Sequence, residues 1–120
     1  MRLLTVLLAE DEPIIAMYIR YLLEKNGLRV IQVTEQQAIT EACKQFHPDL
    51  AILNFKQQDH GDTMALANVL KHRFKLPVMF ITSARAQDVA ASRDFDPSLD
   101  ILYKPFTHAQ LRQCLLRHAG

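Results

Sequence analysis

Short apolar runs alternate with segments of helical spacing along the whole chain. Several runs are almost continuously apolar, which is typical of strands buried on both faces of a sheet. The predicted strands are Leu3 to Ala9, Leu28 to Val33, Leu50 to Leu53, Pro77 to Ile81 and Ile101 to Tyr103. Strands that alternate with helices predict an α/β fold, here a doubly wound, five-stranded parallel sheet with helices on both faces and right-handed crossovers.

The segments between these strands repeat apolar residues at the spacing of one helix face. The four expected faces are Ile15, Ile19, Leu22 and Leu23; Ile39, Ala42, Cys43 and Phe46; Met64, Ala67, Leu70 and Phe74; and Leu111, Cys114, Leu115 and His118. A further short helix is expected over residues 86–93, where the pattern is weakest. Phe95-Asp96-Pro97-Ser98 would break that helix.

Local signals mark several helix ends. Asn26-Gly27 fits the end of the first helix, because both residues tolerate a left-handed conformation. Thr34 with Gln37, and Thr107 with Gln110, fit the capping-box pattern. We therefore expect helices to begin after Thr34 and after Thr107.

Polar residues follow several of the predicted strands. Glu10 and Asp11 come after the first strand, Asn54 closes the third, Thr82 the fourth, and Lys104 follows the fifth. In parallel sheets, ligands bind beyond the carboxyl ends of the strands, near the switch in strand order. Two carboxylates suit Mg²⁺, whereas a hydroxyl and a lysine suit the oxygens of a phosphoryl group. The pattern indicates a site for metal and phosphoryl chemistry on one rim of the sheet.

The order and spacing of these motifs resemble the receiver domain of two-component response regulators, the CheY-like family. The matching stretches are residues 6–13, 48–54, 77–84 and 103–106, so that the resemblance covers essentially the full length. It implies the flavodoxin-like strand order 2-1-3-4-5, of which this family is a standard example.

The resemblance also implies roles for single residues. In this family an aspartate at the end of the third strand accepts a phosphoryl group from a histidine kinase. Glu10 and Asp11 match the metal-binding acidic pair. Thr82 matches the hydroxyl that follows the phosphoryl group, and Lys104 matches the lysine that pairs with it.

Asn54 stands where the acceptor aspartate is expected. Its amide oxygen is neutral and its nitrogen lone pair is delocalised, so it cannot take a phosphoryl group as a carboxylate does. Two interpretations stay open. The chain is an atypical receiver, a pseudo-receiver that acts by protein–protein interaction without phosphorylation, or it is an ordinary phospho-switch receiver captured as an engineered Asp-to-Asn inactive variant.

Other positions depart from the family pattern as well. Ile101 stands where the family usually has an aromatic switch residue, and Tyr103 directly precedes the lysine. The loop after Asn54 usually carries a proline and a glycine, at positions that are Gln58 and Asp62 here. We therefore expect a remodelled loop over residues 55–62, and we favour a natural substitution at the acceptor position.

The loss of one carboxylate changes the charge balance of the site. Lys56 and Lys104 lie within plausible reach of Glu10 and Asp11. We expect divalent metal binding to be weakened, with no cofactor assigned other than weakly held Mg²⁺. Our hypothesis is that a lysine ammonium partly replaces the metal and holds the site in one state; the alternative is that both lysines are solvated.

Composition narrows the remaining function classes. The 120 residues fit a single receiver domain, 1–120, and the formal net charge of +1 gives no reason to expect nucleic acid as a partner. No apolar run has the length of a membrane span, and the two cysteines match no redox or metal motif, so we expect a cytoplasmic protein. Glu10-Asp11-Glu12-Pro13 disfavours a nucleotide-binding domain, which needs a glycine-rich phosphate loop there.

No catalytic residue is assigned, and we expect a signalling protein and not an enzyme. The resemblance implies a protein partner, either a histidine kinase or a downstream effector. Its expected docking face is built from the fourth helix, fifth strand and fifth helix, with Ile101, Tyr103, Phe106 and Arg112 as candidate residues. Core packing explains Phe106 equally well. The expected oligomeric state is a monomer or a weak dimer.

Overall fold

The computed structural model describes residues 4–56 and 62–118, and all statements below concern these residues. The strands are β1 (Thr5–Ala9), β2 (Arg29–Val33), β3 (Leu50–Asn54), β4 (Val78–Thr82) and β5 (Asp100–Tyr103). The helices are α1 (Pro13–Lys25), α2 (Gln37–Phe46), α3 (Asp62–Arg73), α4 (Ala86–Ala90) and α5 (His108–His118).

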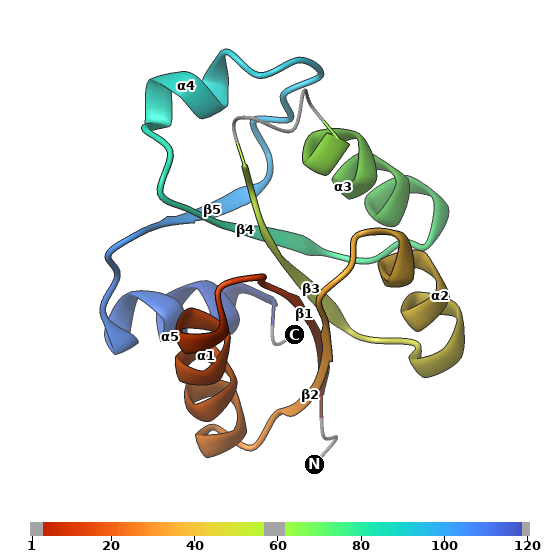
Figure 1. The fold of residues 1–120 in the computed structure, drawn as a ribbon, viewed down its shortest axis with the longest axis vertical. Coiled ribbons are helices and arrows are strands. Elements are labelled where there is room, and N and C mark those ends of the chain that lie inside the picture. The colour runs from red at the N-terminus through yellow and green to blue at the C-terminus, as the bar shows by residue number, and fades with distance from the viewer. Residues whose placement is uncertain (1–3, 57–61, 119–120) are drawn as a thin grey trace.

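The strands form one parallel sheet in the order β2-β1-β3-β4-β5, which confirms the predicted fold and strand order (Figure 1). Helices α1 and α5 cover one face of the sheet. Helices α2 and α3 cover the other face, where α4 also contributes Val89 to the core. The sheet therefore separates two hydrophobic clusters, as expected of a doubly wound fold.

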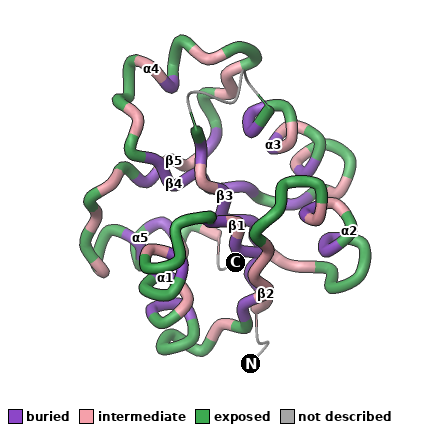
Figure 2. The backbone as a smooth tube through the Cα atoms, in the orientation of Figure 1, coloured by how far each residue is buried: buried purple, intermediate pink, exposed green. Residues whose placement is uncertain are grey.

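Alternation along the strands feeds both clusters. Val6 and Leu8 of β1 pack toward α1 and α5, whereas Leu7 between them packs toward α2 and α3. All of β4 is buried, and the strands form the buried centre of the molecule (Figure 2). This double burial is why the strands read as almost continuous apolar runs.

Helix ends follow the sequence signals in two of three cases. The first helix ends at Asn26-Gly27, with Gly27 in the left-handed region (φ 82°). At α5 the capping box forms as predicted, because Thr107 N donates to Gln110 Oε1 (2.8 Å) and Gln110 N donates to Thr107 Oγ1 (3.1 Å).

The predicted capping box of Thr34 and Gln37 is wrong. Helix α2 begins at Gln37, and Gln36 before it already has helical backbone angles (φ −59°, ψ −39°). Thr34 therefore lies too far upstream to reach the first turn. The Gln37 side chain donates instead to Glu35 Oε2 (3.3 Å).

Two further expectations need correction. Phe46 was expected on the inward face of α2 but is 38% exposed, because the helix ends there and His47 turns the chain through a left-handed conformation (φ 49°). Helix α4 covers only Ala86–Ala90, shorter than the expected 86–93, and Asp94 has a positive φ of 60° that a helix cannot continue. Residues 57–61 of the expected remodelled loop, Gln58 among them, lie outside the described residues.

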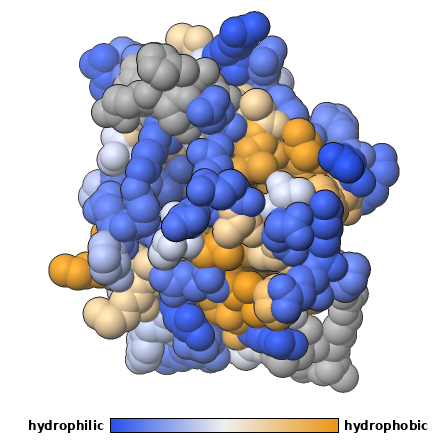
Figure 3. Space-filling view, turned by 45° about the vertical axis from the view of Figure 1, so that its right-hand side comes forward, coloured by the Kyte–Doolittle hydropathy of each residue, from blue (hydrophilic) through white to orange (hydrophobic). Residues whose placement is uncertain are grey.

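Most of the surface in Figure 3 is hydrophilic, and hydrophobic residues show in areas between the polar ones. Among the described residues, every helix is too short or too polar to pass through a lipid bilayer.

Candidate functional site

The polar residues predicted to meet at the carboxyl ends of the strands do meet there. Glu10 and Asp11 follow β1, Asn54 is the last residue of β3, and Thr82 is the last of β4. Lys104 directly follows β5. Because β1, β3, β4 and β5 are successive neighbours in the sheet, their ends place these side chains along one rim.

Asp11 is the centre of an exposed polar cluster. Asn54 Nδ2 donates to Asp11 Oδ1 at 3.2 Å, and the Lys56 ammonium contacts Asp11 Oδ2. The hydrogen bond from Lys56 holds the pKa of the Asp11 carboxyl below its ordinary value of 3.8, against the opposing effect of burial. Asp11 is therefore an anion with both oxygens engaged by this chain's own donors.

Glu10 lies in a different environment one residue earlier. Its side chain is 1% exposed, and Lys104 Nζ lies 3.4 Å from its Oε1 and 3.5 Å from its Oε2. Burial raises the pKa of Glu10 above 4.5, although the Lys104 charge opposes that rise. Lys104 also pairs with the exposed carboxylate of Glu12, at 3.4 Å from its Oε1.

Thr82 is fully buried and fixed by two hydrogen bonds. Its Oγ1 donates to the carbonyl oxygen of Phe55 and accepts from the backbone N–H of Ala84, each at 3.0 Å. The backbone N–H of Lys104 donates to the Thr82 carbonyl at 2.7 Å. Thr82 thus links the ends of β3, β4 and β5, and its hydroxyl is already satisfied by main-chain groups.

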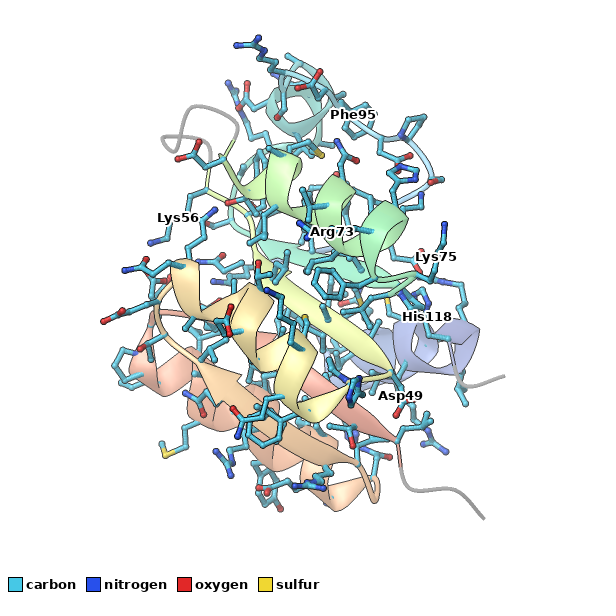
Figure 4. The ribbon with its side chains drawn as sticks, turned by 90° about the vertical axis from the view of Figure 1, so that its right-hand side faces the viewer. Asp49, Lys56, Arg73, Lys75, Phe95 and His118 are labelled. Carbon is cyan, nitrogen blue, oxygen red and sulfur yellow. The ribbon has the colours of Figure 1, made fainter. Side chains whose placement is uncertain are left out.

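Two hollows flank the cluster around Asp11. One of about 300 Å³ reaches toward α2 and α3 and is also lined by Thr34 and Thr63. The other, of about 460 Å³, is more polar and reaches toward Ser83. Asp11, Asn54 and Lys56 line both, and Figure 4 shows Lys56 at the opposite end of β3 from Asp49.

The donor set does not fit a resident Mg²⁺ ion in this arrangement. Mg²⁺ requires oxygen ligands in near-octahedral geometry, usually with carboxylates free to bind it. Both oxygens of Asp11 accept hydrogen bonds, and Glu10 is paired with Lys104 and also accepts from the backbone N–H of Glu12 (3.3 Å). Within the described ranges, no group of three or more His, Cys, Asp or Glu residues is arranged to hold a metal.

The four candidate partner-surface residues divide between two environments. Tyr103 is 37% exposed and Arg112 is exposed. Ile101 packs against the cluster under α2 and α3, whereas Phe106 packs against the cluster under α1 and α5. Phe106 also contacts the Tyr18 ring of α1 (centroids 6.2 Å apart), so it serves core packing on that side.

Two contributors to the site were not identified from the sequence. Glu12 was seen only as part of the acidic run, and its pairing with Lys104 depends on how the chain enters α1. The Phe55 carbonyl that accepts from Thr82 is a backbone group, for which a side-chain pattern gives no signal.

The sheet thus has an acidic pair, a buried threonine and a lysine at its carboxyl rim, as the resemblance to receiver domains predicts. The family model of the response regulator receiver domain matches residues 6–116. The chain belongs to the response regulator receiver domain family, whose members are signalling modules of two-component systems.

Curated relatives have similar sequences over most of this chain. The KDP operon transcriptional regulatory protein KdpE of Escherichia coli (strain K12) is 35% identical over 121 residues, covering 96% of this chain and 52% of KdpE. The phyllosphere-induced regulator PhyR of Methylorubrum extorquens is 32% identical over 108 residues, covering 88% of this chain and 40% of PhyR. The chain thus spans about half the length or less of these relatives.

Solved structures agree in fold. A response regulator receiver protein from Sinorhizobium medicae superposes with a TM-score of 0.81 at 26% identity, over 98% of this chain and 94% of that one. A response regulator from Thermotoga maritima has a TM-score of 0.83 over 98% of each chain; at 18% identity it supports the fold alone.

Proposed function

We propose that this chain is an atypical receiver that does not accept a phosphoryl group and acts by binding another protein. The observation that carries the proposal is the amide of Asn54 at the end of β3, hydrogen-bonded to Asp11. A carboxylate there would place a second anion against Asp11. The amide instead supplies a donor, and no side-chain nucleophile stands at that position.

The two lysines support a fixed state of the site. Lys56 and Lys104 bring an ammonium group to Asp11 and Glu10, which are the residues that match the family's metal-binding pair. In this proposal their charges replace part of what a divalent metal supplies in an ordinary receiver. Thr82 and Lys104 match the phosphoryl-contact positions. In place of a phosphoryl group, Thr82 contacts the Phe55 carbonyl and Lys104 contacts Glu10.

The partner in this proposal is a protein, a histidine kinase or a downstream effector, because receiver domains interact with proteins of these kinds. Exposed Tyr103 and Arg112 are the better candidates of the four predicted surface residues, since Ile101 and Phe106 are partly buried against the core. The proposal treats residues 1–120 as one receiver domain in the cytoplasm, with no role in binding nucleic acid.

The decisive experiment is intact mass spectrometry after incubation with Mg²⁺ and acetyl phosphate. The samples are the unmodified chain, Asn54→Asp, and Asn54→Ala as a matched control without either amide or carboxylate. We expect no mass gain for the unmodified chain and for Asn54→Ala. A gain of one phosphoryl group on the unmodified chain would refute the proposal and indicate another acceptor.

The Asn54→Asp variant separates the two interpretations of the substitution. If it gains a phosphoryl group, the rest of the site is competent, which supports the alternative that an ordinary phospho-switch receiver carries an inactivating Asp-to-Asn change. If it gains none, the site has changed as a whole, which supports a receiver that works by binding alone.

A magnesium titration followed by backbone amide NMR tests the charge replacement by itself. We expect weak and dispersed shifts for the unmodified chain. Lys56→Gln should strengthen the response at Asp11, because it frees one carboxylate oxygen, and Lys44→Gln on α2 is the matched control. Tight Mg²⁺ binding by the unmodified chain, with amide shifts confined to the site, would contradict the replacement of metal by lysine.

A further inference from the structure

The turn that ends helix α1 contains an Asn-Gly pair that the proposed function does not use. Asn26 is the only asparagine of this sequence that precedes a glycine, whereas Asn54 and Asn68 each precede a bulky residue. Both Asn26 and Gly27 are exposed. A side chain at Gly27 would meet no heavy atom within 4 Å, so the space around this turn is open.

An asparagine side chain can react with the backbone of the residue that follows it. The amide nitrogen of that residue attacks Cγ, a succinimide ring closes and ammonia leaves. Such an intramolecular attack is efficient when the two atoms can meet, because no second molecule has to be bound and oriented. A glycine at the second position has no Cβ to hinder the approach, and its backbone reaches conformations that other residues avoid.

The fold holds both reacting groups in hydrogen bonds at the end of α1. The backbone nitrogen of Gly27 donates to the Glu24 carbonyl oxygen (3.0 Å), and Asn26 Nδ2 donates to the Leu22 carbonyl oxygen (2.7 Å). These bonds belong to the last turn of a helix, where local opening costs least. Ring closure therefore requires the opening of this turn and not the unfolding of the domain.

A side chain from another helix lies beside the nitrogen that leaves. His108 Nε2, at the start of α5, is 3.4 Å from Asn26 Nδ2. A general acid must lie within hydrogen-bond reach of the atom that it protonates, and an imidazole with its proton on Nε2 meets this requirement here. Since the amide nitrogen departs as ammonia only after it gains a proton, His108 is well placed to assist that step.

We propose that Asn26 is a site of spontaneous deamidation and that His108 promotes the reaction as a proton donor. When the Gly27 N–H releases the Glu24 carbonyl, the Gly27 nitrogen forms a bond to Asn26 Cγ and its proton passes to solvent. His108 gives a proton to Nδ2, and the Cγ–Nδ2 bond breaks with its electron pair on nitrogen, so that ammonia leaves. Water then opens the succinimide at either carbonyl, giving aspartate or isoaspartate, and His108 regains its proton from solvent.

The product changes both the end of α1 and its charge. A carboxylate has no N–H to donate, so the hydrogen bond to the Leu22 carbonyl is lost. The new negative charge lies at the carboxyl end of the helix dipole, which is unfavourable for an anion. Asn26 also lines a hollow of about 260 Å³ together with Arg112, a candidate partner residue. Deamidation should therefore loosen the end of α1 and place a carboxylate in the same hollow as Arg112.

Peptide mapping by mass spectrometry tests the proposal on the folded chain. The protein is kept in warm, mildly alkaline buffer, and samples are digested with the protease Glu-C, which isolates Asn26 within residues 25–35. Deamidation appears there as a mass gain of about 1 Da, divided between aspartate and isoaspartate forms. Asn26 should react about tenfold faster or more than Asn54 and Asn68. Equal rates at the three asparagines would overturn the proposal. Asn26→Gln, which keeps an amide but must close a larger ring, is the matched control and should stay unmodified.

The His108→Gln variant separates proton donation from a structural role. If the imidazole donates the proton, Asn26 should deamidate several-fold more slowly in the folded variant. If His108 only holds the end of α1 closed, its removal should speed the reaction, and a rate equal to or above that of the parent would overturn its assignment. In concentrated urea the two proteins should react at equal rates, because the imidazole no longer lies beside Asn26; a difference that persists there would overturn it as well. His72→Gln on α3 should deamidate at the parental rate.

Discussion

Two neighbouring carboxylates in this protein carry an ammonium partner in opposite environments. Glu10 and Lys104 form a buried pair, with side chains 1% and 13% exposed, whereas Asp11 and Lys56 form an open pair, 42% and 48% exposed. Burial raises the pKa of Glu10, and the hydrogen bond from Lys56 lowers the pKa of Asp11. Both lysines lower the pKa of their carboxylate, but burial outweighs Lys104 at Glu10, so the pKa values of these adjacent residues shift in opposite directions.

The buried and the exposed ion pair should differ in how much they contribute to stability. Removing one partner of a buried pair leaves an uncompensated charge in a poor dielectric environment, which is strongly destabilising. An exposed pair is screened by water and contributes little to stability. We therefore expect Lys104 to contribute to the stability of the fold at neutral pH, and Lys56 to affect mainly the charge of the site.

The largest expected effect is that of Lys104→Met. It removes the ammonium from Glu10, and we expect the free energy of unfolding at pH 7 to fall by about 3 kcal/mol. Because the pKa of Glu10 is raised, the folded state binds the Glu10 proton at a higher pH than the unfolded state does. The loss should therefore shrink as the pH falls through the folded pKa of Glu10 toward 4.5.

Urea denaturation at several pH values measures this effect. The control is Glu12→Gln, which removes only the exposed partner of Lys104 and should change stability by less than about 0.5 kcal/mol. A Lys104→Met protein as stable as the parent at pH 7 would show that Glu10 does not need its ammonium partner.

An intermediate effect is expected at a third ion pair, between Lys71 of α3 and Asp96. Lys71 Nζ lies 2.6 Å from Asp96 Oδ2, and the side chains are 34% and 20% exposed. This hydrogen bond, together with those from Ser98, lowers the pKa of Asp96 from 3.8 to about 2. Asp96→Asn should destabilise the protein at pH 7 by about 1 kcal/mol.

The pH dependence of Asp96→Asn follows from the lowered pKa. The contribution of Asp96 is fully present above pH 3.8 and is lost as the pH falls from there toward about 2. Urea midpoints of parent and variant should therefore differ at pH 7 and converge in acid. A constant difference across this window would mean that the carboxylate charge is not what stabilises the loop before β5.

The smallest effect on stability is expected for Lys56→Gln, less than about 0.5 kcal/mol in urea denaturation. Its signature is instead a pKa change, because the pKa of Asp11 should rise toward 3.8 when its strongest perturbing partner is removed. Carboxyl ¹³C NMR titration measures this directly. Added salt should raise the pKa of Asp11 as well and leave the pKa of Glu10 largely unaffected. Equal pKa shifts at both carboxylates would contradict the expected difference between the exposed and the buried pair.

The meeting of Glu10, Asp11, Asn54, Thr82 and Lys104 could be predicted from the sequence, since the carboxyl ends of parallel strands share one edge. Which lysine pairs with which carboxylate could not. Lys104 and Glu10 are 94 positions apart, and their contact depends on side-chain conformations and on the path of β5. For Lys56 the sequence left pairing and solvation equally open, and the structure places its ammonium on Asp11.

The helices show a similar division. Periodicity identified the inward faces of α1 and α3, because buried apolar residues repeat there at helical spacing. Periodicity did not predict that Ile14 and Met17 are exposed. An apolar pattern on both faces of α1 does not reveal which face the sheet covers. The misplaced capping box at Thr34 and the exposed Phe46 are errors at helix ends, where local backbone geometry decides the boundary.

The two hydrogen bonds of the Thr82 hydroxyl make the site observable by hydrogen exchange. The Ala84 amide is shielded by a side chain that is itself tied to the end of β3. Its exchange with solvent therefore requires the Thr82 hydroxyl to leave its place. The exchange rate of the Ala84 amide, which lies outside the strands and the charged cluster, therefore reports how often the rim of the sheet opens at Thr82.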